Sequence, residues 1–263
     1  MGRGAQPVGN KTMTVTITRD GHVATVIFDR PPNNHVNADV MRELADALDA
    51  LDADPECRAV VLASAGKVFC GGADLAPTGL LGGGAASLAP FYEQAVRLFR
   101  TKKPIVAALQ GAAVGAGLGL ALVADFRVAS PAARLTANFV KLGFHAGFGL
   151  THTLPRLIGG QRAALMLETG RRIKPDEALA WGLVDVVADD ALAGAQELAR
   201  ELAEGAPLAV QATRATLRTG LADAVRDQAA HELGQQSILM ATADFAEGIR
   251  AVGERRTGSF TGR

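Results

Sequence analysis

A glycine-rich segment that follows a short apolar run, within residues 103–128, places the strongest constraint on the fold. Residues 105–109 are apolar and bounded by proline and glycine, so they are too short for a helix and predict a buried strand. Residues 115–117 (Gly-Ala-Gly) carry almost no side chain, and residues 118–124 are expected to continue as an apolar helix. The free N–H groups of that helix's first turn would suit an anion or a developing oxyanion. The segment therefore predicts a binding site made from backbone.

Two other readings of these glycines have to be weighed. Gly115, Gly117 and Gly119 are spaced GxGxG, which departs from the dinucleotide-binding fingerprint, and no acidic residue ends a second strand at the distance that the fingerprint needs. The glycines also allow close packing of a helix, with no ligand involved. Within this segment alone, close packing and an active-site role both stay open.

Composition favours a small-molecule ligand. Lys plus Arg and Asp plus Glu both number 27, so no overall field attracts nucleic acid or an anionic membrane. The two cysteines are too few for a disulfide framework, and the N-terminal residues lack the apolar core of a signal peptide. The longest apolar run, residues 118–124, cannot cross a bilayer. We therefore expect a cytoplasmic protein with no membrane and no nucleic-acid partner.

Patterning along the chain alternates strands with helices. Residues 1–12 are expected to form a disordered leader, and Asp20-Gly21 predicts a hairpin between strands at 14–19 and 22–29. Asn37 is expected to cap a helix, and residues 59–63 predict a second buried strand. Further helices are expected at 91–100, 150–157, 161–169, from 174, and from 191 onward with breaks at 205–207 and 220, and further strands at 125–130 and 183–187.

A second loop of small residues follows the strand at 59–63. Gly71, Gly72 and Ala73 leave backbone N–H groups accessible, so this loop and the first one can supply two converging donors. Cys70 is either a nucleophile or, as is more common in such a loop with no base nearby in sequence, packed and inert. Asp74 is either part of a site or a cap for the next turn.

Four segments together resemble the crotonase (enoyl-CoA hydratase/isomerase) family. They are residues 69–75 (FCGGADL), 103–108 (KPIVAA), 115–125 (GAGLGLALVAD) and 182–185 (GLVD), in the family's order and spacing. One such motif is a weak signal, whereas four in register are specific. The resemblance spans roughly residues 14–260.

This resemblance implies an α/β fold, a spiral of ββα units over residues 13–190, followed by a helical oligomerisation region over 191–263. It implies homotrimers or hexamers, and apolar positions such as Ile238 and Phe245 in the last helices agree with burial between subunits. It also implies an enzyme of acyl-CoA chemistry, such as those of fatty acid metabolism. No metal and no separate cofactor are expected, because coenzyme A is part of the substrate.

By position, the resemblance assigns the two oxyanion-hole amides to Ala73 and Ala116. It places Ala73, Asp74, Leu75 and Ala76 along the coenzyme A thioester. A basic residue near the C-terminus meets the coenzyme A phosphates in the family, and Arg255 falls at that place. Basic residues that end a helix are also ordinary partners of the helix dipole.

The sequence departs from the family at its two catalytic glutamates. Matched residue by residue, these fall on Gly119 and Phe139, and no Asp or Glu occurs from Phe126 through Leu167. Hydration needs a base for the water and an acid for C2, so an ordinary hydratase reaction is not expected. Losing both carboxylates while keeping the oxyanion hole would favour isomerisation, an enolate-forming step or no chemistry.

The remaining proton-handling candidates are His145, in the loop expected to line the acyl pocket, and Asn138, beside Phe139. His152 and His35 have ordinary alternatives, packing on a helix and bordering coenzyme A respectively. Three classes stay open: an enzyme acting on an unusual acyl-CoA, a catalytically weak or silent acyl-CoA-binding protein, and a nucleic-acid-binding member. The balanced charge argues against the last.

Overall fold

The first sheet begins with the hairpin that the Asp20-Gly21 pair predicts. This computed structural model describes residues 14–75 and 87–263, so the expected leader at 1–12 lies outside the described residues. Strand β1 (Val15–Asp20) pairs antiparallel with β2 (Val23–Phe28), with Asp20 opposite Val23. Gly21 has a φ of 54°, which a tight hairpin turn requires and which glycine adopts at no steric cost.

The larger sheet grows from this hairpin by parallel additions. Helix α1 (Ala38–Ala53), whose N-terminus is capped by the Asn37 side chain, carries the chain to β3 (Ala59–Ser64). Helix α2 (Leu88–Phe99) carries it to β4 (Ile105–Leu109). The six strands lie in the order β1-β2-β3-β4-β6-β9, where β6 is Phe126–Ala129 and β9 is Val186–Val187.

A second, three-stranded sheet runs in the order β5-β7-β8. Its strands are β5 (Ala112–Val114), β7 (Arg134–Thr136) and β8 (Arg172–Ile173). The sequence patterning predicts β4 and β6 but not β5, which lies between β4 and the glycine turn. Since β5 is only three residues long, it has no period of its own and is recognisable only through its parallel partner β7.

The glycine-rich helix differs from its expected bounds. Helix α3 covers Ala116–Ala121, whereas residues 118–124 were the expected span. Gly115, at φ 55° and ψ −116°, makes a turn sharp enough for the helix to begin at once. The helix ends early because Asp125 turns back to accept a hydrogen bond from the Ile105 amide at 2.8 Å, which holds the chain at the start of β4.

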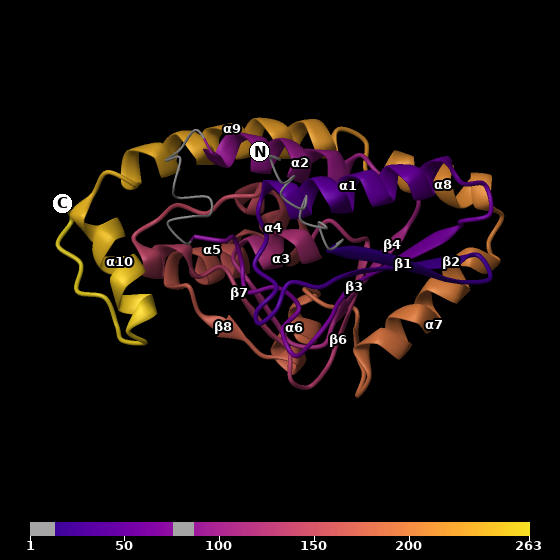
Figure 1. The fold of residues 1–263 in the computed structure, drawn as a ribbon, viewed down its shortest axis with the longest axis horizontal. Coiled ribbons are helices and arrows are strands. Elements are labelled where there is room, and N and C mark those ends of the chain that lie inside the picture. The colour runs from indigo at the N-terminus through magenta and orange to yellow at the C-terminus, as the bar shows by residue number, and fades with distance from the viewer. Residues whose placement is uncertain (1–13, 76–86) are drawn as a thin grey trace, which may run out of the picture.

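Helices cover both faces of the larger sheet. Helices α1, α2 and α9 (Leu221–Leu239) lie side by side along one side, and α7 (Ala191–Glu204) packs on β3 and β4 from the other (Figure 1). The main apolar core lies on the first side, whereas Ala195, Ala199 and Ala203 of α7 complete a smaller core on the second. The first helix of segment 191–263, α7, therefore covers the second face of the larger sheet.

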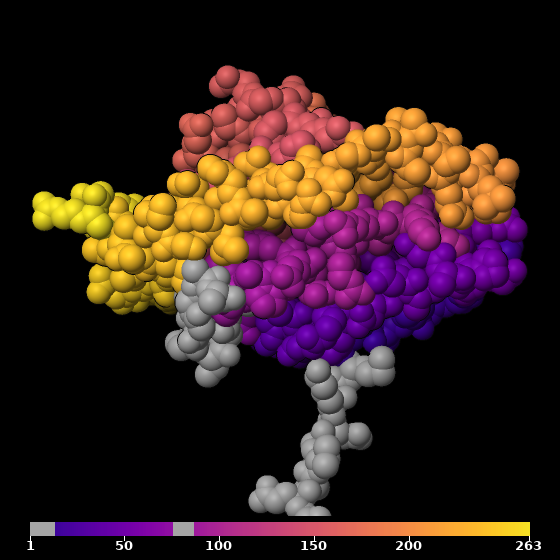
Figure 2. Space-filling view, turned by 90° about the horizontal axis from the view of Figure 1, so that it is seen from above, coloured from indigo at the N-terminus to yellow at the C-terminus, as the bar shows by residue number. Residues whose placement is uncertain are grey.

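The remaining helices connect and border these layers. Helix α9 lies across α2 and also contacts α4 (Figure 2). Breaks near Gly205 and Gly220 separate α7, α8 and α9, as the sequence predicts. Within residues 14–75 and 87–263, no helix is long and apolar enough to cross a membrane. The other bounds are η2 (Asn138–Leu142), α4 (Leu150–Ile158), α5 (Gly160–Thr169), α6 (Pro175–Trp181), α8 (Pro207–Leu217) and α10 (Ala243–Gly253).

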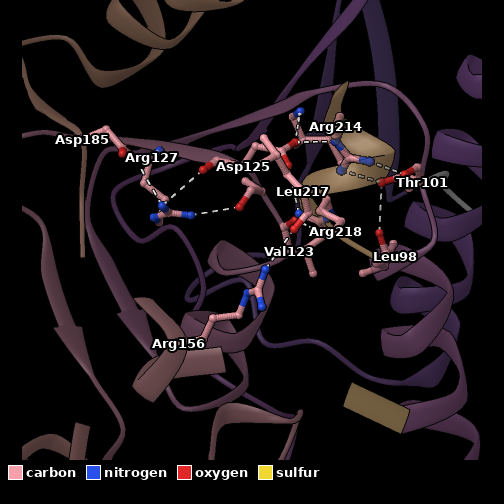
Figure 3. Close-up of polar contacts among 12 residues, drawn as sticks. Leu98, Thr101, Val123, Asp125, Arg127, Arg156, Asp185, Arg214, Leu217 and Arg218 are labelled. Atoms are coloured by element: carbon pink, nitrogen blue, oxygen red, sulfur yellow. Dashed lines mark hydrogen bonds and ion pairs between the residues drawn. The ribbon is translucent and has the colours of Figure 1, made fainter. Parts of the chain in front are cut away.

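A buried ion network fastens helix α8 to the end of α3 and the start of β4 (Figure 3). The Asp125 carboxylate accepts from Arg214 Nε at 2.8 Å and from Arg218 Nη1 at 2.9 Å. Arg214 also donates to the Thr101 carbonyl, and Arg218 donates to the Val123 carbonyl at 3.2 Å. Burial lowers the pKa of Arg218, and the Asp125 charge opposes that shift. One carboxylate therefore holds two largely buried guanidinium groups.

Candidate functional site

A cavity of about 410 Å³ opens between the two small-residue loops, α2, η2 and α10. Residues 71–75, which follow β3, form one rim, and Gly115 and Ala116 form another. Aromatic and aliphatic side chains make up most of the remaining wall. These wall residues are Leu88, Phe91, Tyr92, Phe139, Leu142, Phe144, Ile249 and Val252.

Backbone pairing fixes the two loops relative to each other. Val36 bridges Ala73 and Cys70 bridges Ala113, each in parallel register. The Val36 amide donates to the Gly72 carbonyl at 2.9 Å, and the Asp74 amide donates to the Val36 carbonyl at 2.8 Å. Gly115 donates to the Thr136 carbonyl at 2.9 Å. The Asp74 amide, which follows Ala73, and the Gly115 amide, which precedes Ala116, are thus bonded within the fold.

The amides of Ala73 and Ala116 have no acceptor among the described residues, although both residues line the cavity. Ala116 is the first residue of α3, so its N–H has no intrahelical partner. Ala73 lies between the Gly72 carbonyl and the Asp74 amide, which both bond to Val36. The Ala73 and Ala116 amides are therefore among the unbonded backbone donors of residues that line this cavity.

Two of the glycines have a clear structural reason. Gly115 makes the turn at positive φ. At Gly117, an added Cβ would lie 2.3 Å from the Cys70 carbonyl oxygen, so this glycine allows the two loops to pack together. Close packing of the glycine helix, one of the two explanations that the sequence leaves open, is therefore supported.

Cys70 is packed rather than reactive. Its side chain is fully buried, and burial raises the pKa of its thiol to about 12. The thiol donates weakly to the Gly72 carbonyl at 3.8 Å. Since the thiolate is the nucleophile, this environment supports the inert reading.

An aromatic side chain fills the space beside Gly119. A Cβ added at Gly119 would lie 2.5 Å from Cγ of Phe148. Phe148 is 1% exposed and has a φ of 66°, a conformation uncommon for a bulky residue. A longer side chain at position 119 therefore requires Phe148 to move.

Two of the polar side chains that line the cavity, Asp74 and Tyr92, are engaged with other residues. Asp74 pairs with Arg30 at 2.8 Å. The Tyr92 hydroxyl donates to Gln236 Oε1 at 2.8 Å, and burial raises the pKa of Tyr92. Asn138 lies near Gly115, where its Oδ1 would be 3.7 Å from an added Cβ. His35 also lines the cavity.

Comparison with known proteins places this arrangement in a family. The profile described as enoyl-CoA hydratase/isomerase matches residues 18–263. The chain belongs to the enoyl-CoA hydratase/isomerase family. It is 37% identical over 258 residues to an (E)-benzylidenesuccinyl-CoA hydratase of Thauera aromatica, covering 95% of this chain and all of that protein. It is 33% identical over 250 residues to a 1,2-epoxyphenylacetyl-CoA isomerase of Escherichia coli, covering 92% and 95%.

The fold agrees with the sequence relatives. The crystal structure of a carnitinyl-CoA hydratase from Mycobacterium avium superposes with a TM-score of 0.85 at 31% identity, covering 95% of this chain and 99% of that one. The crotonase-like α/β fold expected from the sequence is therefore confirmed.

Several of the residues singled out from the sequence meet at the cavity of this enoyl-CoA hydratase/isomerase family member. They are Ala73, Asp74, Leu75, Ala116, Asn138 and Phe139. Gly119 is buried behind Phe148, Arg255 is exposed beyond the end of α10, and Ala76 lies outside the described residues.

His145 is not among the residues that line the cavity. Its Nδ1 lies 2.7 Å from the Ala146 carbonyl oxygen, and its ring meets His231 edge to face with centroids 6.5 Å apart. Its own carbonyl accepts from Gln236 Nε2 at 2.9 Å. The structure therefore does not place the imidazole at the cavity, while the His145 carbonyl holds Gln236, the partner of the cavity residue Tyr92.

Sequence reasoning missed the polar support that α9 gives to this loop. The Glu232 carboxylate accepts from the Gly149 amide at 2.7 Å and from the Thr151 amide at 3.0 Å. Burial raises the pKa of Glu232, while these hydrogen bonds lower it. Glu232 and Gln236 continue the buried face of Val225 and Ala229 at helical spacing. Polar residues on an otherwise apolar stripe were the available signal.

Proposed function

We propose that this family member binds an acyl-CoA thioester and holds its carbonyl oxygen, or the enolate formed from it, with the amides of Ala73 and Ala116. The observation that carries the proposal is that the Ala73 and Ala116 amides have no acceptor among the described residues, while both residues line one cavity. Donors fixed in a site that excludes water stabilise a developing oxyanion strongly, because they need no reorganisation during the reaction. Coenzyme A is then part of the substrate, and no separate cofactor is needed.

The acyl group that fits best is large and aromatic. Phe91, Tyr92, Phe139 and Phe144 line the cavity, and aromatic rings favour edge-to-face contacts with one another. The names of the Thauera aromatica and Escherichia coli relatives both describe acyl groups with a phenyl ring. Both observations support an aryl-bearing acyl-CoA over a short aliphatic one.

The reaction that fits best is an enolate-forming step such as isomerisation. The two positions that the family resemblance assigns to catalytic glutamates carry Gly119, behind Phe148, and Phe139, which is an apolar part of the wall. Asn138 is the better placed of the two candidate polar residues, since it lines the cavity and His145 does not. The alternative is a catalytically weak or silent acyl-CoA-binding protein.

We further propose that the protein acts in the cytoplasm as a homotrimer or hexamer. In the described chain, Leu208 is 80% exposed and Ile238 is 65% exposed, while Phe245 is buried within its own chain. Exposed large apolar side chains on α8 and α9 agree with burial against other copies.

Replacing Ala116 by Pro tests the proposed oxyanion hole. Proline removes the amide donor yet suits the first position of a helix, so α3 should form. We expect exchange of the acyl Cα protons in D₂O to fall about 10²–10³-fold, with little change in ground-state affinity. Proton NMR of phenylacetyl-CoA measures the exchange, and calorimetry measures the affinity.

Ala116→Gly is the matched control, since it keeps the N–H. It should retain exchange, and equal exchange in the Pro and Gly variants would refute the role of this donor. Calorimetry of the unchanged protein with acetyl-CoA and phenylacetyl-CoA should give binding to both, with the aryl ester tighter. Binding without any exchange supports the silent alternative, whereas no binding at millimolar ligand rules out both.

A further inference from the structure

A second hollow lies next to the cavity, in the groove between α2 and α9 (Figure 1). It has a volume of about 420 Å³, and its walls include Ala89, Glu93 and Val96 of α2 and Leu233 of α9. The spacing of three and four residues puts the α2 members on one face of that helix. Glu93 and Arg226 are exposed at this groove, so it opens to solvent.

Tyr92 separates the groove from the cavity. Among the described residues that line either hollow, Tyr92 is the one that lines both. Phe91 before it lines only the cavity, and Glu93 after it lines only the groove. Tyr92 is 8% exposed, so its side chain is packed within the chain. The tyrosine side chain is therefore the partition between the two hollows.

The chain holds this partition in place. The Tyr92 hydroxyl donates to Gln236 Oε1 at 2.8 Å, and Gln236 Nε2 donates to the His145 carbonyl at 2.9 Å. Because Gln236 is fully buried, moving the ring away would leave buried polar atoms unpaired. A Cβ added at Gly147 would lie 2.0 Å from the Tyr92 hydroxyl oxygen, so the hydroxyl fits only beside a glycine. Gln236 is thus a positioning residue for Tyr92.

We infer that Tyr92 sets the longest acyl group that the cavity accepts. This inference rests on the proposed function, in which the acyl group enters the cavity with the mostly apolar wall. An acyl chain longer than the cavity would need the space that the Tyr92 ring fills, and displacing the ring would break its bond to Gln236. With a small side chain at position 92 the two hollows would join, and a long chain could extend into the groove between α2 and α9. Tyr92 is then a specificity-determining residue for acyl length.

Two thioesters of different length measure this effect. Phenylacetyl-CoA is the short ligand, and 8-phenyloctanoyl-CoA carries the same ring on a longer chain of methylene groups. Calorimetry with the unchanged full-length protein should show tighter binding of the short ester. Tyr92→Ala should shift the ratio of the two dissociation constants at least about tenfold toward the long ester, the effect of burying roughly two further methylene groups. Tyr92→Phe keeps the ring and should keep the ratio of the unchanged protein.

Tyr92→Leu keeps more apolar packing than Tyr92→Ala and should shift the ratio in the same direction by a smaller factor. It decides the question if circular dichroism shows that Tyr92→Ala is unfolded. Val96→Ala and Leu88→Ala are the matched controls, because Val96 lines only the groove and Leu88 lines only the cavity. Val96→Ala should leave the ratio unchanged, and Leu88→Ala should move it less than Tyr92→Ala does.

An unaltered ratio in the folded Tyr92 variants, with the short ester still bound, overturns the inference. An equal shift in Leu88→Ala also overturns it, since cavity size and not the partition would then set the limit. Failure of the unchanged protein to bind either ester instead refutes the proposed function on which the inference rests.

Discussion

Hydration of crotonyl-CoA by the purified protein is expected to be slow, far below the ceiling of about 10⁸ M⁻¹s⁻¹ that efficient enzymes approach in kcat/KM. General acid and base groups contribute roughly 10²–10⁴-fold each. In this chain, the two positions that the family resemblance assigns to the catalytic glutamates carry Gly119 and Phe139. Phe148 occupies the space that a side chain at 119 would need, and Phe139 is an apolar part of the cavity wall.

Loss of absorbance by the enoyl thioester measures this rate. The same preparation must bind crotonyl-CoA in calorimetry, so that a low rate is not due to inactive protein. His145→Ala and Asn138→Ala then identify the source of any residual rate. A kcat/KM near the diffusional ceiling would show that the residue matching, or the need for two glutamates, is wrong for this chain.

Replacing Asp125 by Ala should lower the free energy of unfolding by about 3–5 kcal/mol, the usual cost of removing one partner from a buried ion pair. Among the described residues, Asp125 is the carboxylate that pairs with both Arg214 and Arg218, whose side chains are 8% and 13% exposed. Removing the carboxylate also leaves the Ile105 amide without its acceptor. Urea unfolding followed by circular dichroism measures the change.

Asp223→Ala is the matched control for this substitution. Asp223 also faces two arginines, Arg100 and Arg226, but its side chain is 64% exposed. Exposed ion pairs contribute about 0–1 kcal/mol, so this variant should unfold near the unchanged protein. Equal losses in the two variants would mean that burial of the Asp125 network does not set its strength.

Local signals predicted most of the regular elements. The Asp20-Gly21 pair predicted the hairpin, Asn37 predicted the start of α1, and Pro175 predicted the start of α6. Each of these depends on a residue and its immediate neighbours, which a single sequence displays. The Ala73 and Ala116 loops could likewise be located, because small residues after a strand are visible without tertiary information.

The contacts that complete the cavity could not be predicted in this way. Tyr92 meets Gln236 across 144 residues of sequence, and Glu232 holds Gly149 across 83. Nothing near Tyr92 or Gly149 signals such a partner, because the pairing depends on how α9 crosses α2 and α4. The position of Phe148 against Gly119 could not be predicted either, since it follows from tertiary packing and from an unusual φ.

The wall that α10 contributes has a consequence for how the protein matures. The cavity is assembled from residues as far apart as His35 and Gly253, and Ile249 and Val252 come from the last helix of the chain. A nascent polypeptide that has made both glycine loops has therefore not yet made an enclosed site. Competence to capture a ligand is acquired only when α10 docks against the segments made earlier.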